Sequence, residues 1–323
     1  MASFWHAWPP RLRTGAAVLV ALAGVAVIGP LFASDPTAII DPRGARLLPP
    51  LAQRQVLYRR DGSAVAAESA SRVNGTWQIM RDGRHEEIPA AEVVRAASRR
   101  FLLGTDNVGR DLLARLLSGG RVSLAVGALA LLVALVLGVG VGVIAGWAGG
   151  WLDAILMRLV DALLAVPMLF LLLFLAVVFR PSLGLLVAIL GFSSWMGVAR
   201  LVRGQVLSLK QRDFVLAARA FGASPLRIAA VHLVPNALTP LAQDAALRLG
   251  DLILVEAALS YLGLGVQPPI ASWGNIVSEG QEVLAEAWWL TFLPAALIAI
   301  TVVGAALAAD GLQQLVRADQ SPR

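Results

Sequence analysis

Residues 122–146 of the chain read VSLAVGALALLVALVLGVGVGVIAG and contain no charged side chain. A helix needs about 20 apolar residues to cross the hydrocarbon core of a bilayer, so this stretch is long enough to span a membrane. Gly138, Gly142 and Gly146 follow one another at intervals of four residues. They lie on one side of such a helix and predict that a second helix packs closely against it.

Other segments of the 323-residue chain share this length and apolarity. The six predicted spans are residues 14–33, 122–146, 155–179, 182–202, 237–260 and 288–309. The whole chain is 58% hydrophobic and 15% charged, whereas soluble domains are about 45–50% apolar and about 25% charged. The sequence therefore predicts an all-α membrane protein with a bundle of six transmembrane helices. The first span is too long for a signal-peptide core, so we expect it to be retained.

The charge of the short loops predicts the orientation, because basic residues gather in cytoplasmic loops. Residues 200–235 carry six basic residues and one acid, whereas residues 262–287 carry three glutamates and no basic residue. Arg11 and Arg13 precede the first span. We therefore expect both termini and the 200–235 loop in the cytoplasm. Residues 34–121 are then expected outside, since long loops translocate largely regardless of their charge.

The predicted spans divide the chain into a tail with the first helix (1–33), an extracytoplasmic segment (34–121) and a five-helix membrane domain (122–317). Within the middle segment, residues 53–90 favour β structure, because Asp61-Gly62 and Asp82-Gly83 each stand between two short runs typical of strands. Asp-Gly supplies the positive φ of a tight hairpin turn. We expect two hairpins that form a small β insert, which is either a docking surface or a passive insertion.

Residue usage excludes several kinds of chemistry. The chain has no cysteine, and its three histidines, His6, His85 and His232, are far apart, so thiolate and clustered-histidine metal sites are not expected. Lys210, the sole lysine, follows Leu209, whereas a phosphate-binding Walker A loop needs a lysine after glycine. The net charge of +6 is carried by arginines beside the spans, without the aromatic interleaving of a nucleic-acid surface. We predict a non-catalytic chain that holds no cofactor, metal or nucleic acid.

The most informative loop lies between the fourth and fifth predicted spans, at residues 203–235. A short helix is predicted to begin there, with Asp213 as its cap. Its apolar residues recur at helical spacing on one face, and they are Phe214, Ala217, Ala218 and Phe221. A small apolar face of this kind needs a partner to bury it.

The residues that follow predict a turn and a second helix. Gly222 is expected to end the first helix, because glycine adopts positive φ without strain. Ser224 and Pro225 are expected to start the second helix as its cap and its first residue. Pro235 is expected to stop that helix before the next span. The prediction is a compact helix–turn–helix on the cytoplasmic side.

This loop resembles the coupling motif of ABC importer permeases. The family pattern is Glu-Ala-Ala, three residues, Gly, nine residues and Ile-x-Leu-Pro, and here Ala217-Ala218, Gly222 and Pro235 occupy matching positions. The departures are Leu216, His232 and Val234. In that family the motif sits in a cleft of the ATPase subunit. The resemblance implies these ATPase-coupling residues: Asp213, Ala217, Ala218, Arg219, Gly222, Ser224, Pro225, His232 and Pro235.

Two further stretches resemble the dipeptide, oligopeptide and nickel branch of the same family. The early signature is LGTDNVGRD at residues 103–111, followed by RLL at 115–117 and RVSL at 121–124. The late signature is EAALSYLGLGV at residues 256–266, followed by Pro268-Pro269 and SWG at 272–274. We interpret the late signature as a structural turn outside the membrane, because no cluster of converging polar groups accompanies it.

The resemblance implies a permease subunit of an ATP-driven, binding-protein-dependent importer in the bacterial inner membrane, working by alternating access. The implied partners are a second homologous permease subunit, two ATP-binding subunits that hold ATP and Mg, an extracytoplasmic substrate-binding protein and membrane lipid. The cargo is left open among dipeptides, oligopeptides, a nickel chelate and glutathione.

Ionisable residues inside the spans are functional candidates. Asp244, Arg248 and Asp251 occupy one arc of the fifth predicted span. They are candidate pathway-lining residues, and the alternative is an intrahelical ion pair that faces a neighbouring subunit. Arg158 and Asp161 in the third span are expected to form a structural pair. The tryptophans near two span ends, at 147, 151, 288 and 289, are interpreted as interfacial anchors.

A second function class is an ion-gradient-driven secondary transporter. Such proteins use broken helices and coordinating groups near the middle of the membrane, and the charged arc at residues 244–251 is the one feature that points to it. An intramembrane hydrolase lacks a nucleophile–base pair in this sequence.

Overall fold

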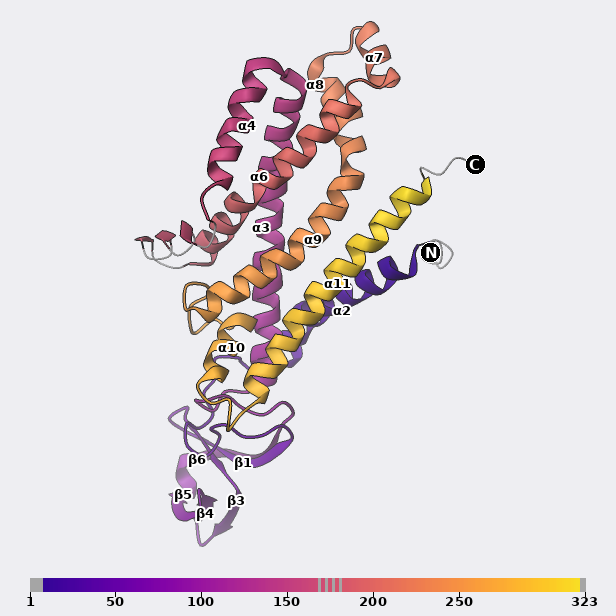
Figure 1. Ribbon diagram of the computed structural model, residues 1–323. Coiled ribbons are helices and arrows are strands. Elements are labelled where there is room, and N and C mark those ends of the chain that lie inside the picture. Colours follow the sequence, from indigo (N-terminus) through magenta and orange to yellow (C-terminus); the bar gives the residue numbers. More distant parts are fainter. Residues whose placement is uncertain (1–7, 168–169, 172–173, 176–177, 180–181, 320–323) are drawn as a thin grey trace. The chain divides into compact units, whose positions relative to one another are not determined.

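The computed structural model describes residues 8–167, 170–171, 174–175, 178–179 and 182–319 (Figure 1). Its first half contains α2 (Pro10–Phe32), β1 (Ala52–Arg59), β2 (Ala64–Ala67), β3 (Ser69–Val73), β4 (Thr76–Arg81), β5 (Arg84–Pro89), η1 (Ala90–Glu92), β6 (Val93–Phe101) and α3 (Leu112–Ala148). The second half contains α4 (Gly150–Leu164), α6 (Leu183–Leu209), α7 (Asp213–Ala220), α8 (Pro225–Ile228), η2 (Ala229–Leu233), α9 (Val234–Tyr261), α10 (Trp273–Gln281) and α11 (Trp289–Asp319).

Four helices of the described residues are long and apolar enough to cross a membrane: α2, α3, α6 and α11. Helix α9 covers the predicted span 237–260, but four ionisable side chains between residues 244 and 256 lower its apolarity. Helix α4 covers the first part of the predicted span 155–179, and residues 168–169, 172–173 and 176–177 of that span lie outside the described residues. The count of six membrane helices therefore stays a prediction.

The chain forms two compact units. The helical unit contains Met1–Ala21, Leu124–Glu256 and Ala299–Arg323, and the mixed unit contains Leu22–Ser123 and Ala257–Ile298. The unit boundaries fall inside α2, α3, α9 and α11. The ends of the apolar segments in the sequence therefore do not mark the ends of the units.

Within the helical unit, α3 packs closely against α6 (Figure 1). A Cβ atom added at Gly138 would lie 2.5 Å from Cβ of Val198, and one at Gly146 would lie 2.8 Å from Cβ of Val206. At Gly142 it would lie 2.7 Å from a backbone oxygen of α6. These distances are too short for real contacts, so the approach of the helices depends on glycine. The predicted close packing against this stripe is confirmed, with α6 as the neighbour.

The start of α2 packs against α11 by the same means. A Cβ atom at Gly311 would lie 2.3 Å from the backbone nitrogen of Leu12, and one at Gly15 would lie 2.4 Å from that of Ala308. The guanidinium of Arg11 also forms an ion pair with Asp310 at 3.1 Å. Small residues therefore allow the close approach of α3 to α6 and of α2 to α11. This is usual in membrane helices, because the hydrophobic effect does not drive helices together in lipid.

The mixed unit contains two antiparallel sheets, with strand orders β2-β1-β6 and β3-β4-β5. Strands β1 and β2 flank Asp61-Gly62, and β4 and β5 flank Asp82-Gly83, where the sequence predicts hairpins. One apolar cluster joins the two sheets through Leu57, Val65, Ala67, Ile79 and Ile88. A second covers the other face of the first sheet, around Ile40, Leu48, Val56 and Phe101.

The prediction of two hairpins omits β3 and β6. Strand β3 is joined to β4 by Asn74-Gly75, which has φ of 48° and 79° and thus uses the same turn chemistry as Asp-Gly. Strand β6 pairs with β1 from Ala52↔Phe101 to Arg59↔Val93. It lies at a sheet edge and is mostly solvent-exposed. Such a strand carries no alternating apolar pattern, so its sequence does not signal it.

Candidate functional site

The cap of helix α7 lies one residue before the predicted one. The cap position is held by Arg212 in an extended conformation, and no side chain makes a cap hydrogen bond there. Asp213 is the first helical residue, so the prediction that it caps the helix is wrong. Its carboxylate still lies in the first turn, where the partial positive charge of the helix amino terminus favours an anion.

Gly222 closes α7 as predicted. Its φ is +79°, and its N–H donates to the carbonyl of Arg219 at 2.9 Å. The N–H of Ala223 donates to the carbonyl of Ala218 at 3.0 Å. This pair of bonds is the Schellman arrangement, which needs positive φ at the residue after the helix. A Cβ atom at Gly222 would meet nothing within 4 Å, so the demand for glycine comes from the backbone.

The second helix also starts as predicted. Ser224 caps α8, because its hydroxyl accepts a hydrogen bond from the N–H of Arg227 at 3.3 Å. Pro225 is the first helical residue, where its missing N–H costs nothing.

Pro235 does not stop this helix, and the prediction that it does is wrong. Helix α8 continues through the π-helical segment η2 into α9. Proline cannot donate to the carbonyl four residues earlier, and its ring collides with that carbonyl in an α-helix. We attribute the wider π turn just before Pro235 to this conflict. The side chain of Asn236 donates to the carbonyl of His232 at 2.6 Å, which satisfies one acceptor of the distorted turn.

One side of the α7–α8 segment is buried in the helical unit. Its buried residues are Val215, Ile228 and Leu233, and they pack with Val198, Val202, Val206 and Leu241. Ala218 is half-buried against the same cluster. The predicted single face is therefore divided, since Ala218 faces the core while Ala217 is exposed.

The other side of the segment presents apolar side chains to the exterior. We define the coupling surface as Phe214, Phe221 and Leu226. Phe221 is 92% exposed and Leu226 is 80% exposed. Phe214 is exposed as well, with its ring centroid 6.0 Å from that of His232. Three large apolar side chains on a small turn form a surface that a partner can cover.

Two contacts that the sequence does not predict hold this segment to α3. The guanidinium of Arg219 lies over the ring of Trp147, with 4.1 Å to the centroid. The ammonium group of Lys210 donates to the carbonyl of Gly146 at 2.9 Å, in the last turn of α3, where a cation is favoured. The interpretation of Trp147 as an interfacial anchor is incomplete, because this residue packs against the core cluster and carries Arg219. No local signal marks a partner so far away in sequence.

Ion pairs connect α4 to α6 near the same end. Arg203 forms a two-point pair with Asp153, with 2.7 Å between Nη2 and Oδ2. Arg200 binds Asp161. The predicted pair of Arg158 with Asp161 is thus wrong, because Asp161 faces the arginine of the neighbouring helix.

The charged arc of α9 separates into a pair and a single carboxylate. Arg248 binds Asp244 of its own helix and donates to the carbonyl of Ser194 on α6 at 3.3 Å. Gly197 makes room for this guanidinium, since a Cβ atom there would lie 2.5 Å from Nη2. Asp251 is exposed and has no hydrogen bond or ion pair with the residues that the structure describes.

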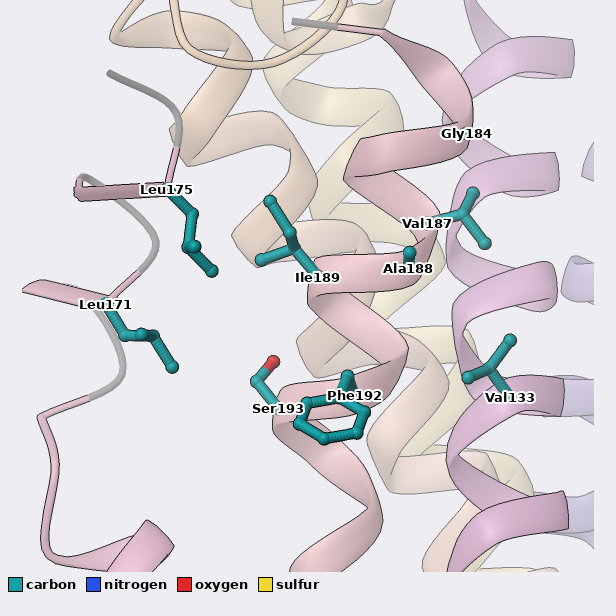
Figure 2. A pocket seen from close by; sticks show the side chains of 9 residues that line it. All are labelled: Val133, Leu171, Leu175, Gly184, Val187, Ala188, Ile189, Phe192 and Ser193. Atoms are coloured by element: carbon teal, nitrogen blue, oxygen red, sulfur yellow. The ribbon is translucent and has the colours of Figure 1, made fainter. Parts of the chain in front are cut away.

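A pocket of about 410 Å³ is lined by residues of α3 and α6 and by Leu171 and Leu175 (Figure 2). Figure 2 shows these two leucines facing Ile189 across it, with Phe192 nearby. Among the lining residues that the structure describes, Ser193 has the one polar side-chain group, and its hydroxyl donates to the carbonyl of Leu190 at 2.9 Å. An apolar lining of this kind offers no counter-charge to a zwitterion.

The early signature forms a buried ion cluster in the mixed unit. Arg115 is 1% exposed. It binds Asp106 at 2.7 Å and Glu279 of α10 at 2.8 Å. Arg110 joins both acids, reaching Glu279 at 3.0 Å. Two cations thus balance two anions, and this explains Arg110, Arg115 and Asp106 of that signature.

The late signature contains the end of α9 and the turn that leads to α10, so the predicted turn is present, while its place outside the membrane stays a prediction. Gly263 has φ of +76°, and Pro268-Pro269 is a cis peptide. Ser272 caps α10 in a reciprocal box with Asn275. The amide of Asn275 also donates to the carbonyl of Ile270 at 2.9 Å. The hydrogen bonds of these side chains stabilise the turn itself.

The long apolar helices define a multi-pass membrane protein. Residues 138–321 match the family described as binding-protein-dependent transport system inner membrane component. The chain belongs to this family. The match supports an ABC importer permease over an ion-gradient-driven secondary transporter.

Three relatives illustrate the resemblance. The dipeptide permease protein DppC of Bacillus subtilis (strain 168) is 40% identical over 65% of this chain and 66% of its own length. The oligopeptide permease protein OppC of Escherichia coli (strain K12) is 44% identical over 65% of this chain and 70% of its own length. DppC of the same strain is 46% identical over 67% of this chain and 72% of its own length. A chain of the inward-facing MetNI methionine ABC transporter has a TM-score of 0.49 at 23% identity, over 65% of this chain and 98% of that chain.

Proposed function

We propose that this chain is a permease subunit of an ATP-driven importer of di- or oligopeptides. The peptide cargo is supported by the relatives, which are named as dipeptide and oligopeptide permeases and are 40–46% identical. The proposed partners are a second homologous permease subunit, two ATPase subunits that bind ATP and Mg, and an extracytoplasmic substrate-binding protein. This chain supplies the pathway and performs no covalent step.

The coupling surface is the observation that carries the link to ATP. Phe221 and Leu226 are exposed, yet their helices are fixed to the helical unit by buried apolar residues and by Arg219 on Trp147. A partner that covers this surface and moves can therefore displace α6 and α9 instead of merely bending a loop. We propose that the partner is the ATPase subunit, and that its motion alternates the access of the pathway.

Uptake of a radiolabelled dipeptide tests the proposed function. Cells that express the complete transporter should accumulate alanyl-phenylalanine only when this chain is present, and uptake should cease when ATP is depleted with the ion gradients held. Continued uptake under ATP depletion would support a secondary transporter. Absence of uptake with all subunits present would reject peptides as the cargo.

The proposed orientation places both termini and α7–α8 in the cytoplasm, with residues 34–121 outside. The chain contains no cysteine, so single cysteines report their own location. We expect an impermeant thiol reagent on intact cells to label Ser71→Cys and not Gln211→Cys, since both positions are exposed. Lysed cells should label both. The opposite pattern in intact cells would reverse the topology.

A further inference from the structure

Three sides of α9 around residue 250 are occupied by helices of the same unit. Ile253 and Leu249 face α3, where Gly127 leaves the space for them. Gly250 faces α11, since a Cβ atom there would lie 3.5 Å from Cα of Val302. Arg248 faces α6, where it reaches the carbonyl of Ser194. Neighbours within the helical unit therefore cover these directions.

The fourth side of α9 is exposed and contains Asp251. Leu247 is 45% exposed and Leu254 is 51% exposed. Asp251 follows Leu247 by four residues and Leu254 follows Leu247 by seven, so the three residues share one face of the helix. Asp244 has Arg248 as its counter-ion, whereas Asp251 has none within the described part of the chain.

Within the predicted span 237–260, a carboxylate in this position is costly against lipid. Ionised side chains in membrane helices face a protein interior or a water-filled cavity, and they pair with an opposite charge. The leucines beside Asp251 offer no hydrogen bond, and the nearby cation, Arg248, is already bound. A carboxylate without donors from its own chain keeps its charge where water reaches it. This side of α9 therefore fits the wall of an aqueous pathway.

We propose that Asp251 binds the ammonium group of the peptide substrate during its passage through the membrane. This inference rests on the proposed function. A peptide carries a cationic amino terminus, and the carboxylate on the exposed side of α9 is complementary to it. Water can solvate the Asp251 carboxylate before the ammonium group arrives and after it leaves. The contact can therefore break quickly enough for transport. Asp244 and Arg248 are positioning residues that fix the helix against α6.

The first test asks whether residue 251 faces water. In the complete transporter, Asp251→Cys should react with an impermeant, cationic thiol reagent, followed by mass spectrometry of this chain. Leu252→Cys is the matched control, since Leu252 is the next residue and is buried. We expect the thiol of Asp251→Cys to react at least about tenfold faster than that of Leu252→Cys. Equal, slow reaction of both variants would overturn the proposal. This measurement needs no peptide, so it does not depend on the cargo.

The second test asks whether the charge serves the substrate. Asp251→Asn should lower dipeptide uptake at least about tenfold, as expected for a lost charge-assisted contact, and Asp251→Glu should restore most of it. Normal uptake by Asp251→Asn would overturn the proposal. Loss of the assembled complex would overturn it too, in favour of an ion pair between subunits. Failure of the wild-type transporter to import any peptide would reject the proposed function instead.

Discussion

Replacing Arg115 with methionine is expected to destabilise the mixed unit strongly. The guanidinium is buried and binds Asp106 and Glu279. Methionine matches its unbranched stem, but it leaves two carboxylates facing Arg110 alone. Removing one partner of a buried ion pair costs about 3–5 kcal/mol. The measurement is the midpoint of heat-induced loss of the monodisperse complex in detergent.

A second substitution separates charge from packing. The double variant Arg115→Met, Glu279→Leu restores the balance of charge, since Asp106 keeps Arg110. Its loss of stability should therefore be smaller than the sum of the two single losses, because residues of one network are not additive. The control is Arg100→Met, at an exposed position of β6 in the same unit. A strictly additive result would contradict the view that the cluster acts through its balanced charges.

Much of the coupling turn is predictable from sequence, because its signals are local. Gly222 and the Ser224-Pro225 pair determine a helix end and a helix start within a few bonds of themselves, and the structure confirms both. The predicted cap at Asp213 is wrong by one position, since a helix cap depends on the backbone of the preceding residue as much as on the side chain. The predicted stop at Pro235 is wrong because α8, η2 and α9 pass it through a π turn, which no single-residue rule describes.

The contacts that give the site its rigidity are not predictable in this way. Arg115 and Glu279 are separated by 164 positions, and α4 and α6 lie between Trp147 and Arg219 in the sequence. Nothing in either local sequence points to the other. The arc at residues 244–251 shows the same limit, because helical spacing places the three charges on one side. The space beside Gly197 determines which of them reaches α6, and this is Arg248.

Gly222→Val is expected to abolish transport while leaving membrane insertion intact. The residue adopts φ of +79° to close α7, and a β-branched residue in this region strains the backbone by about 1–3 kcal/mol. The helix end must then shift, and Phe221, next to it on the coupling surface, shifts with it. Uptake should fall at least about tenfold. Membrane level, co-purification of the ATPase subunit and substrate-stimulated ATP hydrolysis are the measurements.

Two further variants show which property of Gly222 matters. Gly204→Val on α6 makes the same substitution where a Cβ atom meets nothing within 4 Å and φ is not positive, so it should transport normally. Gly222→Asn keeps a residue that tolerates positive φ. If backbone strain is the cause, asparagine retains most of the uptake. The space beside Gly222 is free of atoms of this chain, but the partner can occupy it. If the partner does so, uptake fails with both valine and asparagine at position 222. Normal uptake, co-purification and hydrolysis in Gly222→Val would reduce α7–α8 to a connector, and the proposed mechanical link to the ATPase would be lost.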